Sequence, residues 1–202
     1  MSARDAERIW GKAFLPDLAL IERVLTGLGL DPSERVLDVG TGWGIMAISL
    51  ALHGFPVVTG QPEVESGSHA RDEGHEAGEA SSYGDWRRAA QSLGVADRIR
   101  DQPLRAEELP FPAAAFEGVF LYDTLQHVRN REMALAECIR VTRPGGVLCV
   151  IETNRRGADW YRAEEGFEVD LVDPRDYLDP ATKAAVEIVR GEWSDAFLIR
   201  PG

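Results

Sequence analysis

Hydrophobic and polar positions recur along this chain with two different periods, and these periods predict its strands and helices. Runs with β-type spacing alternate with apolar runs of helical spacing. This alternation is typical of βαβ units and a parallel sheet. Strands are predicted at 36–39, 57–60, 116–123 and 147–151, with a short one near 99–100, and helices at 45–53, 86–93 and 131–142.

The first part of the chain predicts two further helices. Residues 4–29 have helical spacing, and Pro16 is expected to divide them, with Asp17 near the start of the second helix. Trp10 and Phe14 belong to the first helix. Two interpretations of this aromatic pair stay open: packing into the core, or closing over a ligand as a lid formed within residues 1–30.

The last part of the chain contains three runs that alternate like strands, at 166–172, 185–190 and 196–200. The runs at 185–190 and 196–200 look like a closing pair joined by residues 191–195, and such a pair would supply an antiparallel edge of the sheet. The pattern does not say which two of the three runs are the last two strands. We therefore expect one domain over residues 1–202.

Residues 63–85 interrupt the regular pattern. The segment is polar, acidic and rich in glycine, and it is longer than a simple connection between a strand and a helix. We expect an insertion that covers a cofactor or substrate. His69 and His75 lie among acidic residues, but their spacing matches no compact set of metal ligands, so no metal is predicted.

The most informative stretch is the turn after the first predicted strand, which reads Asp38-Val39-Gly40-Thr41-Gly42-Trp43-Gly44. Glycines at alternate positions allow positive φ and leave no Cβ to block a ligand. The helix that follows directs its first N–H groups at the turn. The turn alone also permits a tight connection without a ligand. A nicotinamide dinucleotide site is disfavoured because the third glycine comes one residue early.

This turn resembles motif I of the class I S-adenosylmethionine (SAM) methyltransferases. The stretch from Ala136 to Gly146, which ends in Arg143-Pro144-Gly145-Gly146 before a strand, resembles the same family. The resemblance implies a Rossmann-like α/β fold: a doubly wound, mostly parallel seven-stranded sheet with an antiparallel edge. It also implies SAM as the cofactor, with its amino-acid end beside Asp38, Gly40, Thr41, Gly42, Trp43 and Gly44.

The chain departs from that family where the nucleoside is expected. The family has an acid after the second strand that holds the ribose, whereas here Gln61 or Pro62 takes that place and Glu63 follows. The family also has an acid that reads the adenine edge, and here Arg105 replaces it. The resemblance leaves Gln61, Glu63, Ala106 and Glu107 as the expected nucleoside-binding residues.

Polar residues follow the strand predicted at 116–123. Because ligands of open α/β sheets bind beyond the carboxyl ends of the strands, Tyr122, Asp123 and His127 are expected at the site. His127 is the best candidate for a general base, although it would also suit a helix cap. Asp123 would orient a substrate or the methionine ammonium, or form a structural hydrogen bond; Tyr122 is expected near the cofactor.

The composition of the chain limits the kinds of substrate and environment that we expect. The net charge of -12 disfavours a nucleic-acid substrate, because acidic surfaces repel phosphates. No apolar run approaches the roughly 18 residues of a membrane span. Cys138 and Cys149 lie in apolar patterns and are expected to be reduced thiols of a cytoplasmic protein.

The expected function is SAM-dependent methyl transfer to a small-molecule acceptor, by a monomer or homodimer. The alternative is a non-catalytic methyltransferase-like binding domain, because both nucleoside-reading acids are replaced at Gln61 and Arg105.

Overall fold

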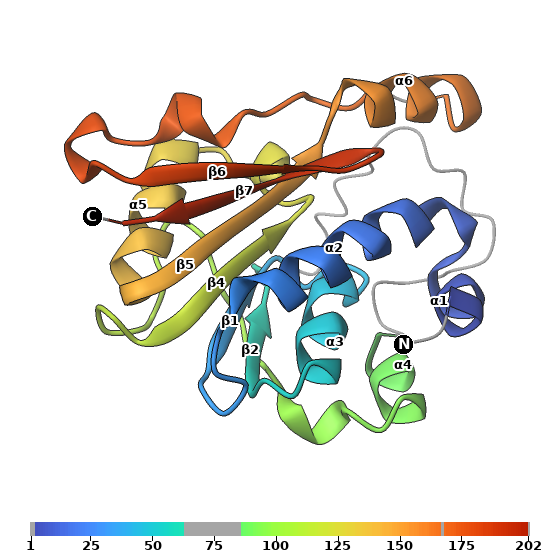
Figure 1. Cartoon of the computed structure of the whole chain (residues 1–202), viewed down its shortest axis with the longest axis horizontal. Coiled ribbons are helices and arrows are strands. Elements are labelled where there is room, and N and C mark those ends of the chain that lie inside the picture. Colours follow the sequence, from blue (N-terminus) through green and yellow to red (C-terminus); the bar gives the residue numbers. More distant parts are fainter. Residues whose placement is uncertain (1–2, 63–85, 167, 202) are drawn as a thin grey trace.

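One sheet organises the computed structural model, which describes residues 3–62, 86–166 and 168–201. Its seven strands lie in the order β3-β2-β1-β4-β5-β7-β6 (Figure 1). The strands from β3 to β5 are parallel, and β7 runs antiparallel to both β5 and β6. The predicted fold class is confirmed. The strands are β1 (Val36–Val39), β2 (Val57–Gly60), β3 (Ile99–Asp101), β4 (Phe116–Tyr122), β5 (Thr142–Thr153), β6 (Ala185–Arg190) and β7 (Ser194–Arg200).

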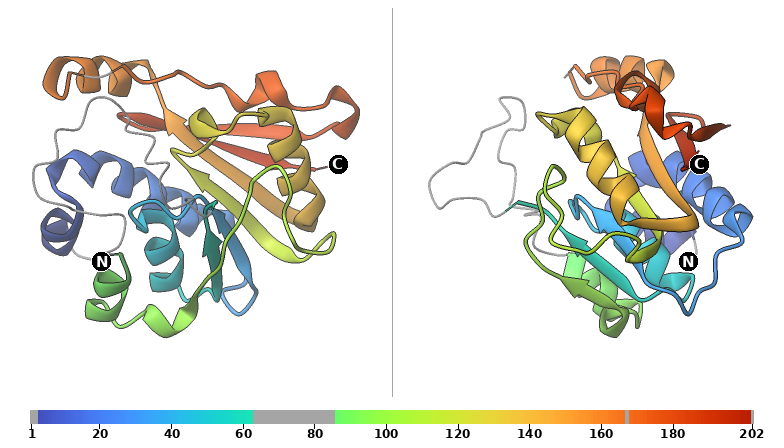
Figure 2. Two further views of the ribbon diagram at one scale, coloured as in Figure 1. Left: turned by 180° about the vertical axis from the view of Figure 1, so that it is seen from behind. Right: turned by 90° about the vertical axis from the view of Figure 1, so that its left-hand side faces the viewer.

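Helices cover both faces of the sheet (Figure 2). The α-helices are α1 (Ala3–Trp10), α2 (Leu15–Leu28), α3 (Ile45–Leu52), α4 (Trp86–Ser92), α5 (Arg131–Val141) and α6 (Arg155–Glu164). Short 3-10 helices are η1 (Lys12–Phe14), η2 (Ala96–Arg98), η3 (Leu125–His127), η4 (Pro174–Tyr177) and η5 (Pro180–Thr182).

The sheet divides the core in two. On one face, residues of α1 to α4 pack with Val36, Phe120 and Ile151. On the other face, α5 and the segment 104–109 pack with Leu37 and Val119. All four residues of β1 are buried because both faces of this central strand are covered. The carboxyl ends of β1 and β4 are therefore fixed from both sides.

The division of the N-terminal segment is confirmed, and its place is refined. Gly11 adopts a φ of 86° between α1 and η1, so the chain turns there. Pro16 lies in the first turn of α2, where its missing N–H costs no hydrogen bond. Trp10 is 7% exposed and packs in the core beside α2, as the core interpretation of this residue expected.

The strand predicted at 166–172 is wrong. Described residues 168–172 form no strand, and the antiparallel edge consists of β6 and β7. Val172 is buried in the core on the α5 face, whereas Leu171 is 38% exposed. The alternation therefore arises because the Val172 side chain packs on the core, and not because this segment pairs with a neighbouring strand.

Two other sequence predictions concern the start of β5 and the segment 63–85. β5 begins at Thr142, before the predicted 147, because Thr142 pairs with Phe116 and an irregularity follows before Val147 pairs with Gly118. The insertion predicted at 63–85, including Glu63, lies outside the described residues.

Within the described ranges, no helix has both the length and the apolar character needed to cross a membrane.

A glycine at the end of β2 gives a test of this packing. A Cβ at Gly60 would lie 1.9 Å from the backbone oxygen of Gln102, whereas one at Gly27 in α2 would meet nothing within 4 Å. Gly60→Ala should lower the free energy of unfolding by roughly 1 to 3 kcal/mol. Gly27→Ala should raise it by roughly 0.5 to 1 kcal/mol through helix propensity. Urea unfolding of both variants checks this; equal effects would contradict the close approach at β2.

Candidate functional site

Three glycines shape the turn between β1 and α3. Gly40, Gly42 and Gly44 have φ of 93°, 45° and 72°, so each adopts the positive φ that the sequence predicted. The Gly40 N–H donates to the Gly60 oxygen at 2.8 Å, and the Gly44 N–H donates to the Thr41 oxygen at 2.7 Å. These bonds fix the turn against β2 and direct the start of α3 toward it.

The turn is crowded at one glycine and open at the next. A Cβ at Gly40 would lie 2.3 Å from the Thr124 Oγ1 atom, so a side chain there would collide with the end of β4. A Cβ at Gly42 would meet, among described residues, only the Gly40 oxygen at 4.0 Å. Trp43 is 40% exposed, and its carbonyl oxygen accepts a 3.0 Å hydrogen bond from the Trp10 indole. The backbone at Gly42 is thus accessible to a ligand.

A buried carboxyl group underlies the turn. Asp38 is fully buried, and its Oδ2 atom accepts a hydrogen bond from the Thr59 hydroxyl at 2.7 Å. The hydroxyls of Thr59 and Thr41 are 2.8 Å apart, which links β1, β2 and the turn. The Oδ1 atom of Asp38 has no partner in the described part of the chain. Burial is the main cause that raises the pKa of Asp38 to about 7.

Gln61 supports the same turn from β2. Its side-chain oxygen accepts a hydrogen bond from the Gly42 N–H at 3.1 Å. The residue that replaces the family's ribose-binding acid therefore contacts the glycine turn directly. Glu63, the other residue predicted for this role, lies outside the described residues.

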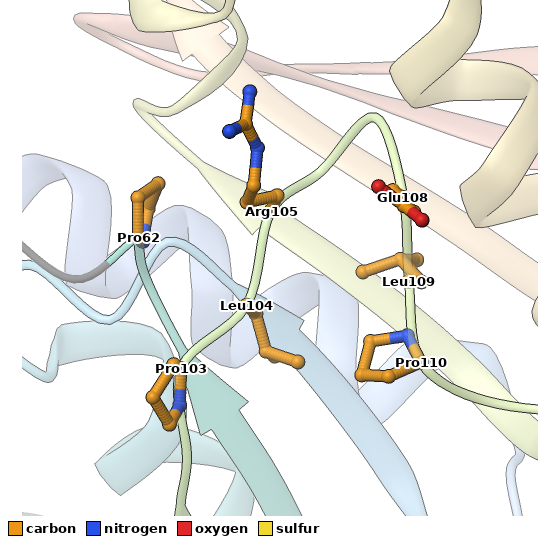
Figure 3. Close-up of a pocket in the computed structure, with 7 residues that line it drawn as sticks. All are labelled: Pro62, Pro103, Leu104, Arg105, Glu108, Leu109 and Pro110. Atoms are coloured by element: carbon orange, nitrogen blue, oxygen red, sulfur yellow. The ribbon is translucent and has the colours of Figure 1, made fainter.

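A pocket of about 540 Å³ lies beside Gln61, between the end of β2 and the segment that follows β3 (Figure 3). Leu104 and Leu109 line it with apolar surface, while Arg105 and Glu108 provide opposite charges on the same segment. Of the other residues predicted here, Ala106 is buried and Glu107 is half-buried. The full lining is Pro62, Pro103, Leu104, Arg105, Glu108, Leu109 and Pro110.

Asp123 follows β4 in a left-handed conformation, with φ of 49°. Its Oδ1 atom accepts hydrogen bonds from the Gln126 amide at 2.5 Å and the Thr153 hydroxyl at 3.2 Å. Burial is the main cause that raises the pKa of Asp123, and His127 lowers it. His127 is exposed on η3, so the structure brings the two predicted catalytic residues together.

Two buried carboxyl groups at this edge were missed from the sequence. Glu152 at the end of β5 accepts hydrogen bonds from the N–H groups of Thr124 at 3.1 Å and Leu125 at 2.7 Å. Asp17 in α2 accepts the Tyr122 hydroxyl at 2.8 Å. Both positions carried a signal: Glu152 ends an apolar strand, and Asp17 lies three residues before the buried Leu20 on the same helix face.

Apart from Ala106 and Glu107 on the pocket segment, the predicted site residues that the structure describes gather in two groups. The glycine turn with Asp38 and Gln61 forms one, and Tyr122 with Asp123 and His127 forms the other at the neighbouring strand. Within the described residues, no group of three or more His, Cys, Asp or Glu side chains could hold a metal ion. The site therefore offers an accessible backbone turn, buried acids and one exposed imidazole.

The buried Asp38 predicts a pH dependence of stability. Its pKa rises from an ordinary 3.8 to about 7, so the folded protein retains a proton that the unfolded chain releases in this interval. This stabilisation is complete below about pH 4 and is lost as pH rises to about 7. In Asp38→Asn, the free energy of unfolding should decline less over this range, by roughly 1 kcal/mol or more.

Urea unfolding at several pH values measures the decline. The exposed Asp97→Asn variant is the matched control and should follow the wild type. An equal decline in Asp38→Asn and wild type would contradict a buried carboxyl group that titrates below the glycine turn.

Known proteins resemble this chain in sequence and fold. It is 32% identical over 137 residues to an S-adenosyl-L-methionine-dependent Diels-Alderase of Talaromyces variabilis, covering 67% of this chain and 41% of the relative. It is 31% identical to the 27-O-demethylrifamycin SV methyltransferase of Amycolatopsis mediterranei, covering 65% of this chain and 43% of the relative. The chain thus spans less than half the length of these two relatives.

A crystal structure of a SAM dependent methyltransferase from Aquifex aeolicus shares the fold, with a TM-score of 0.59 and 16% identity over 98% of each chain. The family model described as a methyltransferase domain matches residues 37–150. This match covers the glycine turn, the pocket segment, and β4 with η3, where the predicted catalytic residues Asp123 and His127 lie. The chain therefore belongs to the methyltransferase domain family.

Proposed function

We propose that this protein is a SAM-dependent methyltransferase that acts on a small-molecule acceptor. The observation that carries the proposal is the open backbone at Gly42, in a turn where three successive glycine positions have positive φ. The turn follows β1, whose neighbours β2 and β4 continue the chain in opposite directions across the sheet. Open α/β sheets bind their ligands at such a switch point, beyond the carboxyl ends of the strands.

The residues present fit SAM at its amino-acid end. The accessible Gly42 leaves room for close backbone approach, and the unpartnered Oδ1 atom of Asp38 is a buried hydrogen-bonding group beneath the turn. Tyr122 and Asp123 border the same space from β4. The residues proposed to hold this end are Asp38, Gly40, Thr41, Gly42, Trp43, Gly44, Tyr122 and Asp123.

The nucleoside end fits the pocket beside β2. Its prolines and leucines offer an apolar lining that suits a planar base. Gln61, which precedes the pocket residue Pro62, is proposed to form a hydrogen bond with a ribose hydroxyl. Ala106 supplies a backbone N–H on the same segment, next to Glu107. Arg105 in place of an acid changes which hydrogen bonds the base receives but leaves the pocket formed.

His127 is proposed as the general base. SAM, when bound, supplies an electrophilic methyl group. The protein's work is then to align an acceptor and to remove its proton. His127 is exposed on η3, where an acceptor can reach its imidazole, and Asp123 lies close enough for the two side chains to interact electrostatically.

Residues 1–30 are proposed to contribute the wall of the acceptor site within a single domain. The Trp10 indole bonds to the Trp43 carbonyl, so the N-terminal helices contact the glycine turn itself. The relatives support a small acceptor, since one of them is named for methylating 27-O-demethylrifamycin SV. The acidic net charge of -12 is consistent with an acceptor that is not a nucleic acid.

A second candidate is ring-forming catalysis beside a SAM molecule that keeps its methyl group. It is favoured by the relative named a SAM-dependent Diels-Alderase, at 32% identity. Conversion of SAM to S-adenosylhomocysteine (SAH) separates the two candidates, because only methyl transfer consumes SAM.

The cofactor site can be tested with Gly42→Val. Its branched side chain would project into the open space over the turn, so we expect SAM and SAH binding to fall at least about a hundredfold, which is roughly 2.7 kcal/mol. Gly94→Val is the matched control, because Gly94 also has positive φ and open surroundings but ends α4. Titration calorimetry measures both; equal affinity in wild type and Gly42→Val would refute the site.

The general base can be tested with His127→Ala. Loss of the proton acceptor should lower kcat about a hundredfold or more, while SAM affinity stays within about twofold. The readout is SAH formation with an acceptor found by screening hydroxylated small molecules. His53→Ala is the control, since His53 bonds to Glu22 beyond the far end of α3. Unchanged turnover in His127→Ala would remove this residue from the mechanism.

A further inference from the structure

Asp17 is a buried acid that the proposed mechanism does not use. It lies in the first turn of α2 and is only 4% exposed. Figure 1 shows this end of α2 on the side toward which the arrows of β4 and β5 point, the side that α6 also borders. The helix therefore places a carboxyl group at the carboxyl edge of the sheet, where the ligand is proposed to lie.

One half of this carboxyl group is satisfied and the other is not. The Tyr122 hydroxyl donates to its Oδ2 atom at 2.8 Å. The Oδ1 atom is buried and has no hydrogen-bond partner in the described part of the chain. A buried carboxylate oxygen without a partner is costly, and functional sites are where proteins retain such groups. The Oδ1 atom of Asp17 can therefore accept a hydrogen bond from a bound ligand or interact with a positive charge on it.

The surroundings of Asp17 are anionic. Burial, the largest effect, raises its pKa to about 6, while the hydroxyls of Tyr122 and Ser194 lower it. The Ser194 hydroxyl thus lies near the carboxyl group, but it does not reach the Oδ1 atom with the geometry of a hydrogen bond. Asp123 raises the pKa of Asp17 further by charge repulsion. Among the described residues, no arginine or lysine contributes to the pKa shift of Asp17 or Asp123. A cation would therefore be attracted to this corner, and an anion would be repelled.

The position of Tyr122 connects this corner to the glycine turn. Tyr122 ends β4, the strand next to β1, and Thr124 two residues later packs directly on Gly40. A ligand seated on the turn would thus lie close to the Asp17–Tyr122 pair. If that ligand is SAM, as proposed above, it carries a sulfonium charge that SAH lacks, while both carry the same ammonium and carboxylate groups.

We propose that Asp17 is a charge-selecting residue that favours the cationic, sulfonium form of the cofactor over the neutral thioether product. The inference rests on the proposed function and goes beyond it. It assigns to α2 a part in choosing between SAM and SAH. Because the cofactor's net charge falls from +1 to zero when its methyl group leaves, the attraction ends with the reaction and the product is released more readily.

Three ligands, two of them cationic and one neutral, test this inference. SAM and sinefungin, which has an ammonium group in place of the methyl sulfonium, are cations, and SAH is neutral. In Asp17→Asn, calorimetry at pH 8 should show affinities for SAM and sinefungin about tenfold weaker than in wild type, with SAH changed by less than about twofold. Asn preserves the shape and can still accept the Tyr122 hydroxyl.

Two further variants separate charge from structure. Tyr122→Phe removes the hydrogen bond but keeps the carboxylate, so its ratio of SAM to SAH affinity should not fall. Glu22→Gln changes an exposed acid on the same helix and should leave all three affinities as in wild type. If Asp17→Asn does not fold by circular dichroism, the double variant Asp17→Leu with Tyr122→Phe replaces both partners with apolar groups and takes its place.

The outcomes are distinct. Equal ratios of SAM to SAH affinity in wild type and the charge-free variant would overturn the role of Asp17 and leave the proposed function standing. A parallel loss for all three ligands would assign Asp17 to helix packing and would also overturn it. A wild-type protein that binds none of the three would contradict the cofactor itself and this inference with it.

Discussion

The fold of this site depends on one close approach, between the backbone of Gly40 and the side chain of Thr124. Gly40 follows β1 and Thr124 lies two residues after the neighbouring β4, and a Cβ on Gly40 would lie 2.3 Å from the Thr124 hydroxyl. Only glycine fits there, and its positive φ turns the chain away from β4. A Cβ on Gly42, two residues later, would meet only the Gly40 oxygen, at 4.0 Å, among the described residues. The turn is therefore crowded at Gly40 and accessible at Gly42.

Three buried carboxyl groups surround this contact, and each has one bonded and one unpartnered oxygen. Glu152 fixes the chain after β4 through two backbone N–H groups, and burial is the main cause that raises its pKa to about 8. Asp38 joins β1 to β2, and Asp17 joins α2 to β4. Buried carboxyl groups with an unpartnered oxygen lower the free energy of unfolding. That three of them lie at one edge of the sheet indicates a function that uses their charge.

Local pattern predicted most of the sheet because its central strands are short, apolar and separated by clear turn signals. β1, β2 and β4 lie where the alternation placed them, and the glycine turn has the predicted conformation. Residues 166–172 were assigned wrongly, because the alternation of Leu171 and Val172 arises from docking on a distant core. Alternation alone does not distinguish a strand from such a segment.

Within the candidate site, the residues that are close in sequence were predictable and those that meet across the fold were not. Asp123 and His127 lie four positions apart, the first directly after β4 and the second on η3. The contact of Asp17 with Tyr122 spans 105 positions, so no local signal indicates their pairing. The sequence placed Asp17 near the start of the second helix, but neither its burial nor its partner was predicted.

The most direct test of the central claim is a crystal structure of this chain with SAH bound. We expect the homocysteine part to lie against Gly42, with the base in the pocket that Pro62, Leu104 and Leu109 line. A structure in which protein side chains fill the space over Gly42, or in which SAH binds away from the carboxyl ends of β1 and β4, would contradict it.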